Sequence, residues 1–498
     1  MGNHRNGRNY EDEERMDSGR QERRRRRKRA QRIAYAILAV TVVVLGSAGF
    51  FAVRGLSSIM EQNAGEAQAA EAAEAASGET SEAPAVIETP EETSSIEIKS
   101  DEELLDEIAQ ASISTMSLED KVAGLFFITP EALTGYDTVT EAGNATQEAL
   151  KQYPVGGLIY FADNLVDREQ VSAMLDTTVK SSKYPIFLGV DEEGGTVARI
   201  AGNENFGVTD VGAMADIGAT GDASQAGAAG ETIGTYLSEL GFTVDFAPVA
   251  DVLLDSSNTT IGTRSFGSDP AADAAMVGAF VTGLQQTGVS ACVKHFPGLG
   301  DTTVDTHTGA AATERTVQDM AEGDFISFQG GIDAGTDLVM VSHVAAPNVN
   351  GDDTPSSLSY EMITNQLRGT LGYNGVVITD ALNMGAITEQ YTSAEAAVAA
   401  LQAGADMLLM PENFQEAYEG VLAAVQDGTL TEERIDESLL RIYRVKKKSA
   451  IADMNADSEE NSAENSSEAQ SGAEQGDAGA SANVAEDGAE ATSGSTVE

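Results

Sequence analysis

The sequence has a single cysteine in 498 residues, Cys292, so no disulfide can form within the chain. It lies in an apolar run, and we expect it to be a small buried core residue. Paired cysteines and a His-Glu-x-x-His pattern are both missing, so we expect no metal centre and no cofactor. No Gly-x-Gly-x-x-Gly turn follows the first apolar run, and Gly-Lys-Ser/Thr is also lacking, which argues against a nucleotide site.

Basic residues are scarce and unevenly placed. Only 30 Lys and Arg stand against 80 Asp and Glu, and twelve of the 30 lie in residues 1–32. A nucleic-acid interaction is one interpretation of this basic segment, but the next segment favours another. The 21 residues of 33–53 carry no charge, enough to cross about 30 Å of hydrocarbon as a helix. With basic residues on its N-terminal side, this segment predicts a single-pass anchor in the cell membrane, with the N-terminus cytoplasmic and the remainder exported.

A cleaved signal peptide is the alternative for this segment. The apolar stretch is longer than a usual signal-peptide core, and the nearest Ala-x-Ala, Ala67 to Ala69, lies well downstream. We therefore expect an uncleaved anchor and no nucleic-acid partner.

The segments on either side of the central region have unusual compositions. Residues 61–98 are dominated by Ala, Glu, Ser and Thr and contain no aromatic residue, so they cannot bury enough apolar surface to offset chain entropy. We expect 54–112 to form a partly disordered tether. Residues 453–498 contain no Lys or Arg, and we interpret 449–498 as an acidic disordered tail. The compact, monomeric domain is expected over 113–448.

That domain contains short apolar runs separated by segments of helical pattern. The runs are Ala123–Thr129, Gly157–Phe161, Ile186–Val190, Thr243–Val252, Ala291–Phe296, Leu338–His343, Gly375–Thr379 and Asp406–Met410. The helical segments are Arg168–Ser181, Gln225–Leu240, Ala271–Thr287, Met320–Ala334, Tyr360–Leu371 and Ala394–Ala403. Alternating strands and helices predict an α/β fold with parallel strands, here a (β/α)₈ barrel of the TIM type. An open doubly wound sheet is the alternative.

Polar residues stand where these strands end. They are Asp191, Asp245, Asp251, Lys294, His295, His343 and Asp380. The C-terminal ends of barrel strands open on one face, where active sites lie. The sequence therefore predicts a site on that face.

The run from Lys294 to His307 resembles glycoside hydrolase family 3 and, within it, the bacterial β-N-acetylglucosaminidases. Their pattern is Lys-His-Phe-Pro-Gly-x-Gly followed by Asp-Ser/Thr-His. It is matched here by Lys294, His295, Phe296, Pro297, Gly298, Gly300, Asp305, Thr306 and His307. Leu299 is a departure, because many members carry histidine there.

The resemblance implies roles for individual residues. Asp380, in the run from Gly375 to Met384, matches the nucleophile, and His307 partnered by Asp305 matches the acid/base. An imidazole titrates near about 6.5, where donating and recovering a proton are both accessible. The implied sugar ligands are Asp191, Arg199, Arg264, Lys294 and His295, since charged groups make short, directional hydrogen bonds.

The resemblance implies an exo-acting, retaining β-N-acetylglucosaminidase that removes N-acetylglucosamine from cell-wall glycans or related aminosugar glycans. Many β-glucosidases of the family carry a second α/β domain after the barrel, and we expect none after Lys448, where the acidic tail begins. The alternatives are a β-N-acetylglucosaminide phosphorylase or β-glucosidase on the same scaffold, and a tethered glycan-binding protein without turnover.

Overall fold

A computed structural model of the chain describes residues 100–302, 309 and 311–448. They belong to one compact unit that begins at Glu97. The predicted anchor (33–53), the basic segment, most of the tether and the acidic tail lie outside the described residues, as do Asp305 and His307. Within the described ranges, none of the helices has both the length and the apolar character needed to cross a membrane.

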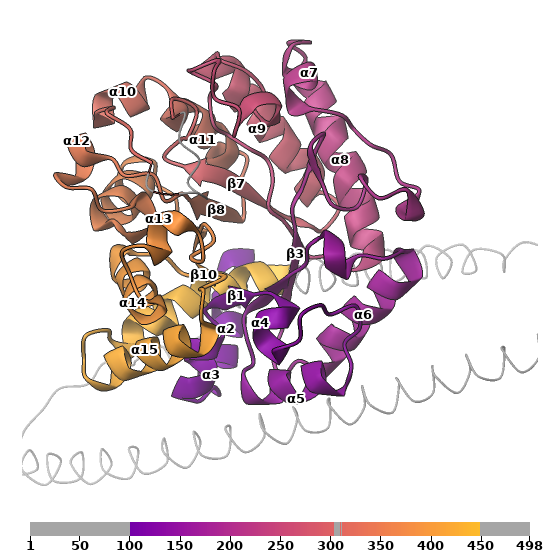
Figure 1. The fold of residues 1–498 in the computed structure, drawn as a ribbon, viewed down its shortest axis with the longest axis vertical. Coiled ribbons are helices and arrows are strands. Elements are labelled where there is room, and N and C mark those ends of the chain that lie inside the picture. Colours follow the sequence, from indigo (N-terminus) through magenta and orange to yellow (C-terminus); the bar gives the residue numbers. More distant parts are fainter. Residues whose placement is uncertain (1–99, 303–308, 310, 449–498) are drawn as a thin grey trace, which may run out of the picture. The chain divides into compact units, whose positions relative to one another are not determined.

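Eight parallel strands form the centre of this unit (Figure 1). They are β1 (Phe126–Ile128), β2 (Gly157–Ile159), β3 (Phe187–Val190), β6 (Val244–Asp245), β7 (Ser290–Phe296), β8 (Leu338–Val341), β9 (Val376–Thr379) and β10 (Leu408–Leu409). Every residue of these strands is buried, as expected for a parallel sheet covered by helices.

The strand order is β10-β1-β2-β3-β6-β7-β8-β9. An isolated parallel bridge between Ile378 of β9 and Met407, next to β10, brings the two outer strands together. The sheet is therefore nearly closed, which agrees with the predicted TIM-type barrel rather than with an open doubly wound sheet. A short antiparallel hairpin of β4 (Glu192–Gly194) and β5 (Val197–Ala198) follows β3.

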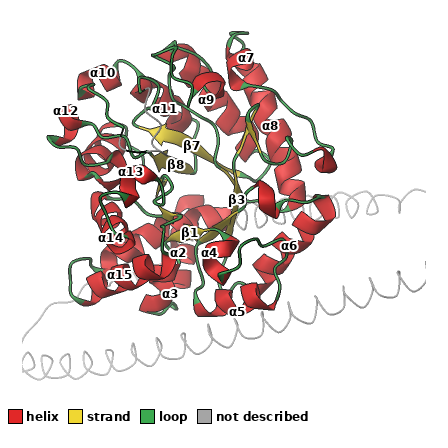
Figure 2. Cartoon of the chain, viewed as in Figure 1, coloured by secondary structure: helices red, strands yellow, loops and turns green. Residues whose placement is uncertain are grey.

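Helices surround the strands (Figure 2). The α-helices are α2 (Asp101–Ile113), α3 (Leu118–Ala123), α4 (Pro130–Thr134), α5 (Asn144–Gln152), α6 (Arg168–Ser181), α7 (Met214–Gly218), α8 (Ala223–Leu240), α9 (Pro270–Gln285), α10 (Val317–Ala321), α11 (Asp324–Asp333), α12 (Pro347–Asn350), α13 (Gly385–Thr388), α14 (Ser393–Ala403), α15 (Phe414–Gln426) and a helix over 432–448. Short 3₁₀-helices are η1 (Ala162–Asn164), η2 (Glu204–Phe206), η3 (Gly262–Arg264) and η4 (Ser356–Leu358). The element η5 (Glu361–Thr370) is a π-helix.

Small residues let α8 and α9 pack closely. A Cβ atom at Gly230 would lie 2.4 Å from the carbonyl oxygen of Phe280, and one at Gly283 would lie 2.1 Å from that of Gly227. These distances are shorter than any real Cβ contact, so the two helices require glycine at both positions.

Three expectations about local structure need correction. The predicted strand 243–252 ends at Asp245, and Pro248, which has no N–H to donate, lies within the remainder. The predicted helix 320–334 is two helices, separated at Gly323, whose φ of −131° and ψ of −112° are not helical. Residues 101–112 were assigned to the tether, but they form most of α2, which buries Ala109 in the core.

Candidate active site

A cavity of about 350 Å³ lies where the C-terminal ends of β3, β7, β8, β9 and β10 meet. Among the residues that line it are Asp191, Arg199, Arg264, Lys294, His295 and Asp380. The structure therefore brings together all six predicted site residues that it describes. Their individual roles remain predictions.

The hairpin after β3 places Glu193 and Val197 at the cavity, and Arg199 follows directly after it. Glu192, which precedes Glu193 in β4, is buried. Its carboxylate accepts hydrogen bonds from the backbone N–H groups of Ile200 (2.7 Å) and Ala201 (2.8 Å) and from the hydroxyl of Tyr236 (2.8 Å). These bonds fix the backbone directly after Arg199. Glu192 thus supports the hairpin from behind the cavity.

Lys294 lies between two carboxylates in the cavity. Its Nζ is 2.7 Å from Oδ1 of Asp191 and 2.6 Å from Oε1 of Glu193. Burial acts to lower the pKa of Lys294, but these two carboxylates outweigh it and raise the pKa above its usual value. For Glu193, burial acts to raise the pKa, but Lys294 and Arg264 outweigh it and hold the pKa well below its usual value. Both groups are therefore charged at neutral pH.

The tautomer of His295 follows from its two partners. Nη2 of Arg264, which can only donate, lies 3.3 Å from Nε2 of His295, so Nε2 must accept. Nδ1 then carries the proton and donates to Oδ2 of Asp251 at 2.7 Å. Oδ1 of Asp251 also accepts from the backbone N–H of Leu299 at 2.7 Å. The hydrogen-bond network therefore gives the ring of His295 a fixed orientation.

Asp380 presents one free carboxylate oxygen to the cavity. Its backbone N–H donates to the carbonyl of Val341 at 2.8 Å, and its Oδ1 accepts from the N–H of Ala381 at 2.8 Å. No residue in the described part of the chain donates to Oδ2. Burial acts to raise the pKa of Asp380, but the N–H of Ala381 and the positive charge of Lys294 favour the carboxylate, and the pKa lies below its usual value. Asp380 is therefore ionised, as a nucleophile must be.

Arg199 offers an unused donor. Its Nε is buried and has no hydrogen-bond partner among the residues of 100–302, 309 and 311–448, and its guanidinium carbon lies 6.0 Å from the ring centre of Phe161. Arg199 can therefore donate to an acceptor oxygen of a bound ligand. A buried donor without a partner is costly unless a ligand or water satisfies it.

Two other aspartates at strand ends have different surroundings. Asp251 supports His295, as described above. Asp245 accepts from the backbone N–H of Glu192 at 2.9 Å, and burial raises its pKa well above the usual value. Its Oδ2 is buried without a partner in the described chain. Asp245 lies outside the cavity lining, so it contributes to the site through Glu192.

The two ends of the segment that contains Asp305 and His307 are anchored beside the site. Oγ1 of Thr313 donates to Oδ2 of Asp301 at 2.6 Å, and the N–H of Ala345 donates to the carbonyl of Ala311 at 2.8 Å. Residues 303–308 and 310 themselves lie outside the described residues. Asp305 and His307 therefore remain predictions from the sequence.

Sequence reasoning missed Glu193, which forms ion pairs with both Arg264 and Lys294 in the cavity. The signal that could have found it is its place inside the Asp191-Glu-Glu-Gly-Gly run. Leu299, the departure from the family pattern, lines the cavity and packs in a small apolar cluster with Val249, Ile261, Ala311 and Val344. It therefore gives the site an apolar wall at this position.

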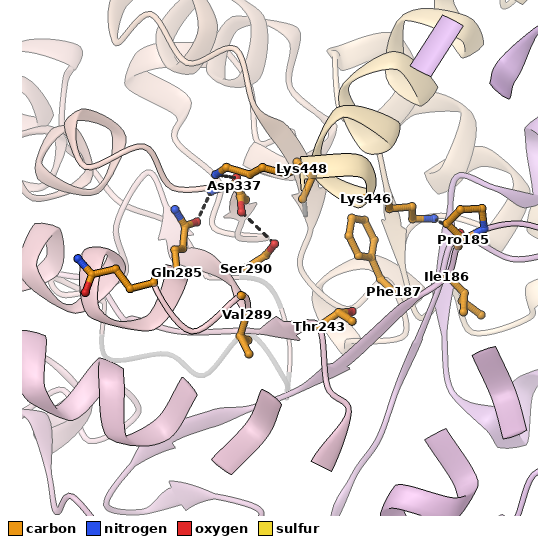
Figure 3. Close-up of a pocket in the computed structure, with 13 residues that line it drawn as sticks. Pro185, Ile186, Phe187, Thr243, Gln285, Val289, Ser290, Asp337, Lys446 and Lys448 are labelled. Atoms are coloured by element: carbon orange, nitrogen blue, oxygen red, sulfur yellow. Dashed lines mark hydrogen bonds and ion pairs between the residues drawn. The ribbon is translucent and has the colours of Figure 1, made fainter. Parts of the chain in front are cut away.

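A larger cavity of about 410 Å³ lies at the opposite, N-terminal ends of the strands (Figure 3). Its charged groups have structural partners. Lys448 pairs with Asp337 at 2.9 Å, and Lys446 donates to the carbonyls of Gly156 (2.7 Å) and Pro185 (2.9 Å). Active sites of barrels lie at the other face, so we assign the chemistry to the Asp380 cavity. In the described ranges, no cluster of three or more His, Cys, Asp or Glu is suited to a metal.

Comparisons with known proteins agree with this geometry. The model of the glycosyl hydrolase family 3 N-terminal domain matches residues 117–445. Beta-hexosaminidase A of Pseudoalteromonas piscicida is 32% identical over 334 residues, which cover 60% of this chain and 54% of that protein. The chain therefore spans about half the length of this relative. Several further curated relatives are also named beta-hexosaminidases.

Two solved structures are informative. A family 3 beta-N-acetylglucosaminidase from Paenibacillus sp. FPU-7 is 36% identical, with a TM-score of 0.63, covering 68% of this chain and 64% of that one. A structure named beta-glucoside phosphorylase BglX is 25% identical, with a TM-score of 0.62, covering 71% of this chain and 62% of that one.

Proposed function

The chain belongs to glycoside hydrolase family 3, and from that premise we propose that it is an exo-acting, retaining β-N-acetylglucosaminidase. Asp380 attacks the anomeric carbon and forms a covalent glycosyl-enzyme. His307, held by Asp305, protonates the leaving oxygen and then activates water. The substrate is a β-linked N-acetylglucosamine at the non-reducing end of a cell-wall or related aminosugar glycan.

The observation that carries this proposal is the environment of Asp380. One carboxylate oxygen is held by the N–H of Ala381, and the other has no donor in the described chain and belongs to a residue that lines the cavity. Such a carboxylate can attack a carbon without first breaking a hydrogen bond to the attacking oxygen. Retaining glycosidases need a nucleophile of this kind.

The remaining polar residues of the cavity suit a sugar. Asp191 accepts hydrogen bonds, while Arg199, Arg264 and Lys294 donate them. A sugar hydroxyl can therefore find a partner in the cavity both as a donor and as an acceptor. The buried pairs around Glu193 hold these groups in place before a ligand arrives, and this preorganisation reduces the entropic cost of binding.

We place the site of action outside the cytoplasm. This part of the proposal depends on the uncharged segment 33–53 and the basic residues before it. Protease added to intact cells is expected to degrade the barrel while sparing an N-terminal epitope. Protection of both ends would overturn this topology.

The experiment for activity compares matched 4-nitrophenyl N-acetyl-β-glucosaminide and β-glucoside with the full chain. We expect release of N-acetylglucosamine, with the β-anomer as the first product by proton NMR. Turnover of the glucoside alone would favour a β-glucosidase. Asp380→Asn should abolish turnover, while Asp137→Asn, the same change at an exposed position, should leave it unchanged. Glycan binding by the wild type without turnover would instead favour a binding protein.

A β-N-acetylglucosaminide phosphorylase is the second candidate. The similarity to the structure named beta-glucoside phosphorylase BglX favours it. A histidine acid/base also repels incoming phosphate less than a second carboxylate would. Phosphorus and proton NMR of the products in phosphate buffer together distinguish the two: sugar 1-phosphate, seen by phosphorus NMR, indicates phosphorolysis, and free sugar, seen by proton NMR, indicates hydrolysis.

A further inference from the structure

His343 lies two residues after β8 and is buried, with 1% of its surface exposed. It does not line the cavity, so it does not touch a ligand bound there. Its Nε2 is 2.9 Å from the carbonyl oxygen of Ala381, and its Nδ1 is 2.7 Å from the hydroxyl oxygen of Ser357. Both ring nitrogens therefore have a defined partner.

These partners determine the proton position on the ring. A carbonyl oxygen can only accept, so Nε2 of His343 must carry a proton. In the neutral ring Nδ1 is then the acceptor, and the hydroxyl of Ser357 donates to it. Ser357 is fully buried, and its N–H donates to the carbonyl of Ser342 at 2.9 Å. The serine is therefore itself held in place.

The hydrogen bond from His343 to Ala381 connects this histidine to Asp380, the proposed nucleophile. Ala381 directly follows Asp380, and its N–H donates to Oδ1 of Asp380 at 2.8 Å. His343 holds the carbonyl oxygen of the same alanine. Ala381 is thus fixed at its N–H and at its C=O, and its orientation determines which oxygen of Asp380 is left for attack.

We propose that His343, kept as the Nε2–H tautomer by Ser357, is a positioning residue for the nucleophile Asp380. It acts through Ala381 rather than on the substrate. This inference rests on the proposed function of Asp380. If His343 cannot donate, the backbone after Asp380 is released, and the carboxylate loses its fixed direction toward the anomeric carbon. Small displacements of a reacting group reduce rates by about 10²-fold.

The test uses two amides that differ by one methylene. In His343→Gln the side-chain N–H₂ lies near the position of Nε2 and can still donate to Ala381. In His343→Asn it lies near Nδ1 and cannot reach that carbonyl. The measurement on the full chain is the rate of covalent trapping by a 5-fluoro-N-acetylglucosaminyl fluoride, with inhibition by N-acetylglucosamine and the unfolding midpoint recorded in parallel.

We expect His343→Asn to slow trapping by about 10–100-fold while the inhibition constant changes less than about 3-fold. His343→Gln should restore the trapping rate to within about 5-fold of the wild type. Ser357→Ala should lie between the two, and Ser357→Thr, which keeps the hydroxyl, should resemble the wild type. If a His343 variant does not fold, the two Ser357 variants still test the positioning role of His343.

Equal trapping rates in His343→Asn, Ser357→Ala and the wild type would overturn the inference. A loss in both amide variants that follows the unfolding midpoint would also overturn it, because that pattern indicates a purely structural role. Failure of the proposed function is visible separately: the trapped sugar would then be found on a residue other than Asp380 in the wild type, or no sugar would be trapped.

Discussion

Glu193 holds Arg264 through both of its carboxylate oxygens, with Oε2 at 2.7 Å from Nε and Oε1 at 2.8 Å from Nη2. The same Oε1 lies 2.6 Å from Nζ of Lys294. One buried carboxylate therefore balances two cations that line the cavity. Bidentate pairing also fixes the plane of the guanidinium group.

The first prediction concerns this carboxylate. Glu193→Gln should lower the free energy of unfolding by about 3–5 kcal/mol, because it removes the carboxylate partner of Arg264 and one of the two carboxylate partners of Lys294. It should also reduce kcat/KM by at least about 10²-fold, since Arg264 and Lys294 lose their fixed positions. Urea unfolding and kinetics on the aryl N-acetylglucosaminide measure the two effects.

Glu239→Gln is the matched control. Glu239 pairs with Arg168 at 2.8 Å, but 60% of the Glu239 side chain and 41% of the Arg168 side chain are exposed, so the change should cost less than about 1 kcal/mol. If the two variants lose the same stability, burial does not determine the importance of Glu193.

The second prediction is a pH dependence of stability at the start of α9. Burial, with smaller contributions from Asp269 and Asp324, raises the pKa of Asp273 from 3.8 to about 7. A raised pKa gives a contribution to stability that is complete below the unfolded pKa and is lost as the pH rises through about 7. Asp273→Asn should therefore raise the free energy of unfolding at pH 8 by on the order of 1–3 kcal/mol and have little effect at pH 3.

For Asp319, in the first turn of α10, we expect the contribution to stability to change with pH in the opposite direction. Hydrogen bonds from the hydroxyl and N–H of Thr316 lower its pKa, so its contribution is present above the unfolded pKa and lost on acidification. Asp319→Asn should destabilise the protein at pH 8. The same sign for both variants at pH 8 would contradict the assignment of burial as the cause at Asp273.

The third prediction tests whether α2 belongs to the folded unit. Ile113 is fully buried, and Arg444 forms an ion pair with Asp106 of the same helix. Ile113→Ala in the full chain should cost about 2–4 kcal/mol, whereas Ile326→Ala, at a position 38% exposed, should cost less than about 1 kcal/mol. A fragment of residues 97–448 should fold, and one of residues 114–448 should be less stable. Equal stability of the two fragments would show that α2 is dispensable.

Much of the barrel was predictable because its strands are short, apolar and regularly separated by helical segments. α6 has the predicted bounds, Arg168–Ser181, since Asp167 caps it at the N-terminus. α2 was missed because its acidic surface resembles the tether before it, and among residues 102–113 only Ala109 and Ile113 are fully buried. At the break, Arg315 packs against Gly323, and a Cβ there would lie 2.3 Å from Nη2 of Arg315. Such a contact is not visible in a single segment of sequence.

The candidate site divides in the same way. Residues at strand ends, such as Asp191 and Asp380, were predictable because parallel strands place their C-terminal ends together. The contacts that these and the other site residues make with one another were not predictable. The contact of Glu193 with Arg264 joins residues 71 apart, and that of His295 with Asp251 joins residues 44 apart. These pairs depend on the packing of several strands, which hydrophobic periodicity does not specify.

The last prediction concerns His307, the expected general acid. Removing a general acid harms only leaving groups too basic to depart unaided, and its contribution is typically about 10²–10⁴-fold. His307→Ala should therefore be severe on a natural disaccharide and mild for glycosylation by an aryl glycoside with an acidic phenol. With the aryl substrate the glycosyl-enzyme should accumulate, because water attack has lost its base. Mass spectrometry of the quenched reaction measures this accumulation.

Azide provides the control for this mechanism, because it attacks the glycosyl-enzyme without needing a base. Added azide should restore turnover of the aryl glycoside by His307→Ala and give a β-glycosyl azide, since two inversions at the anomeric carbon retain its configuration. Asp380→Asn should not recover in this way with net retention, because it forms no glycosyl-enzyme. If His307→Ala slows both substrates equally and azide rescues neither, then His307 is not the acid/base, even if Asp380 is the nucleophile.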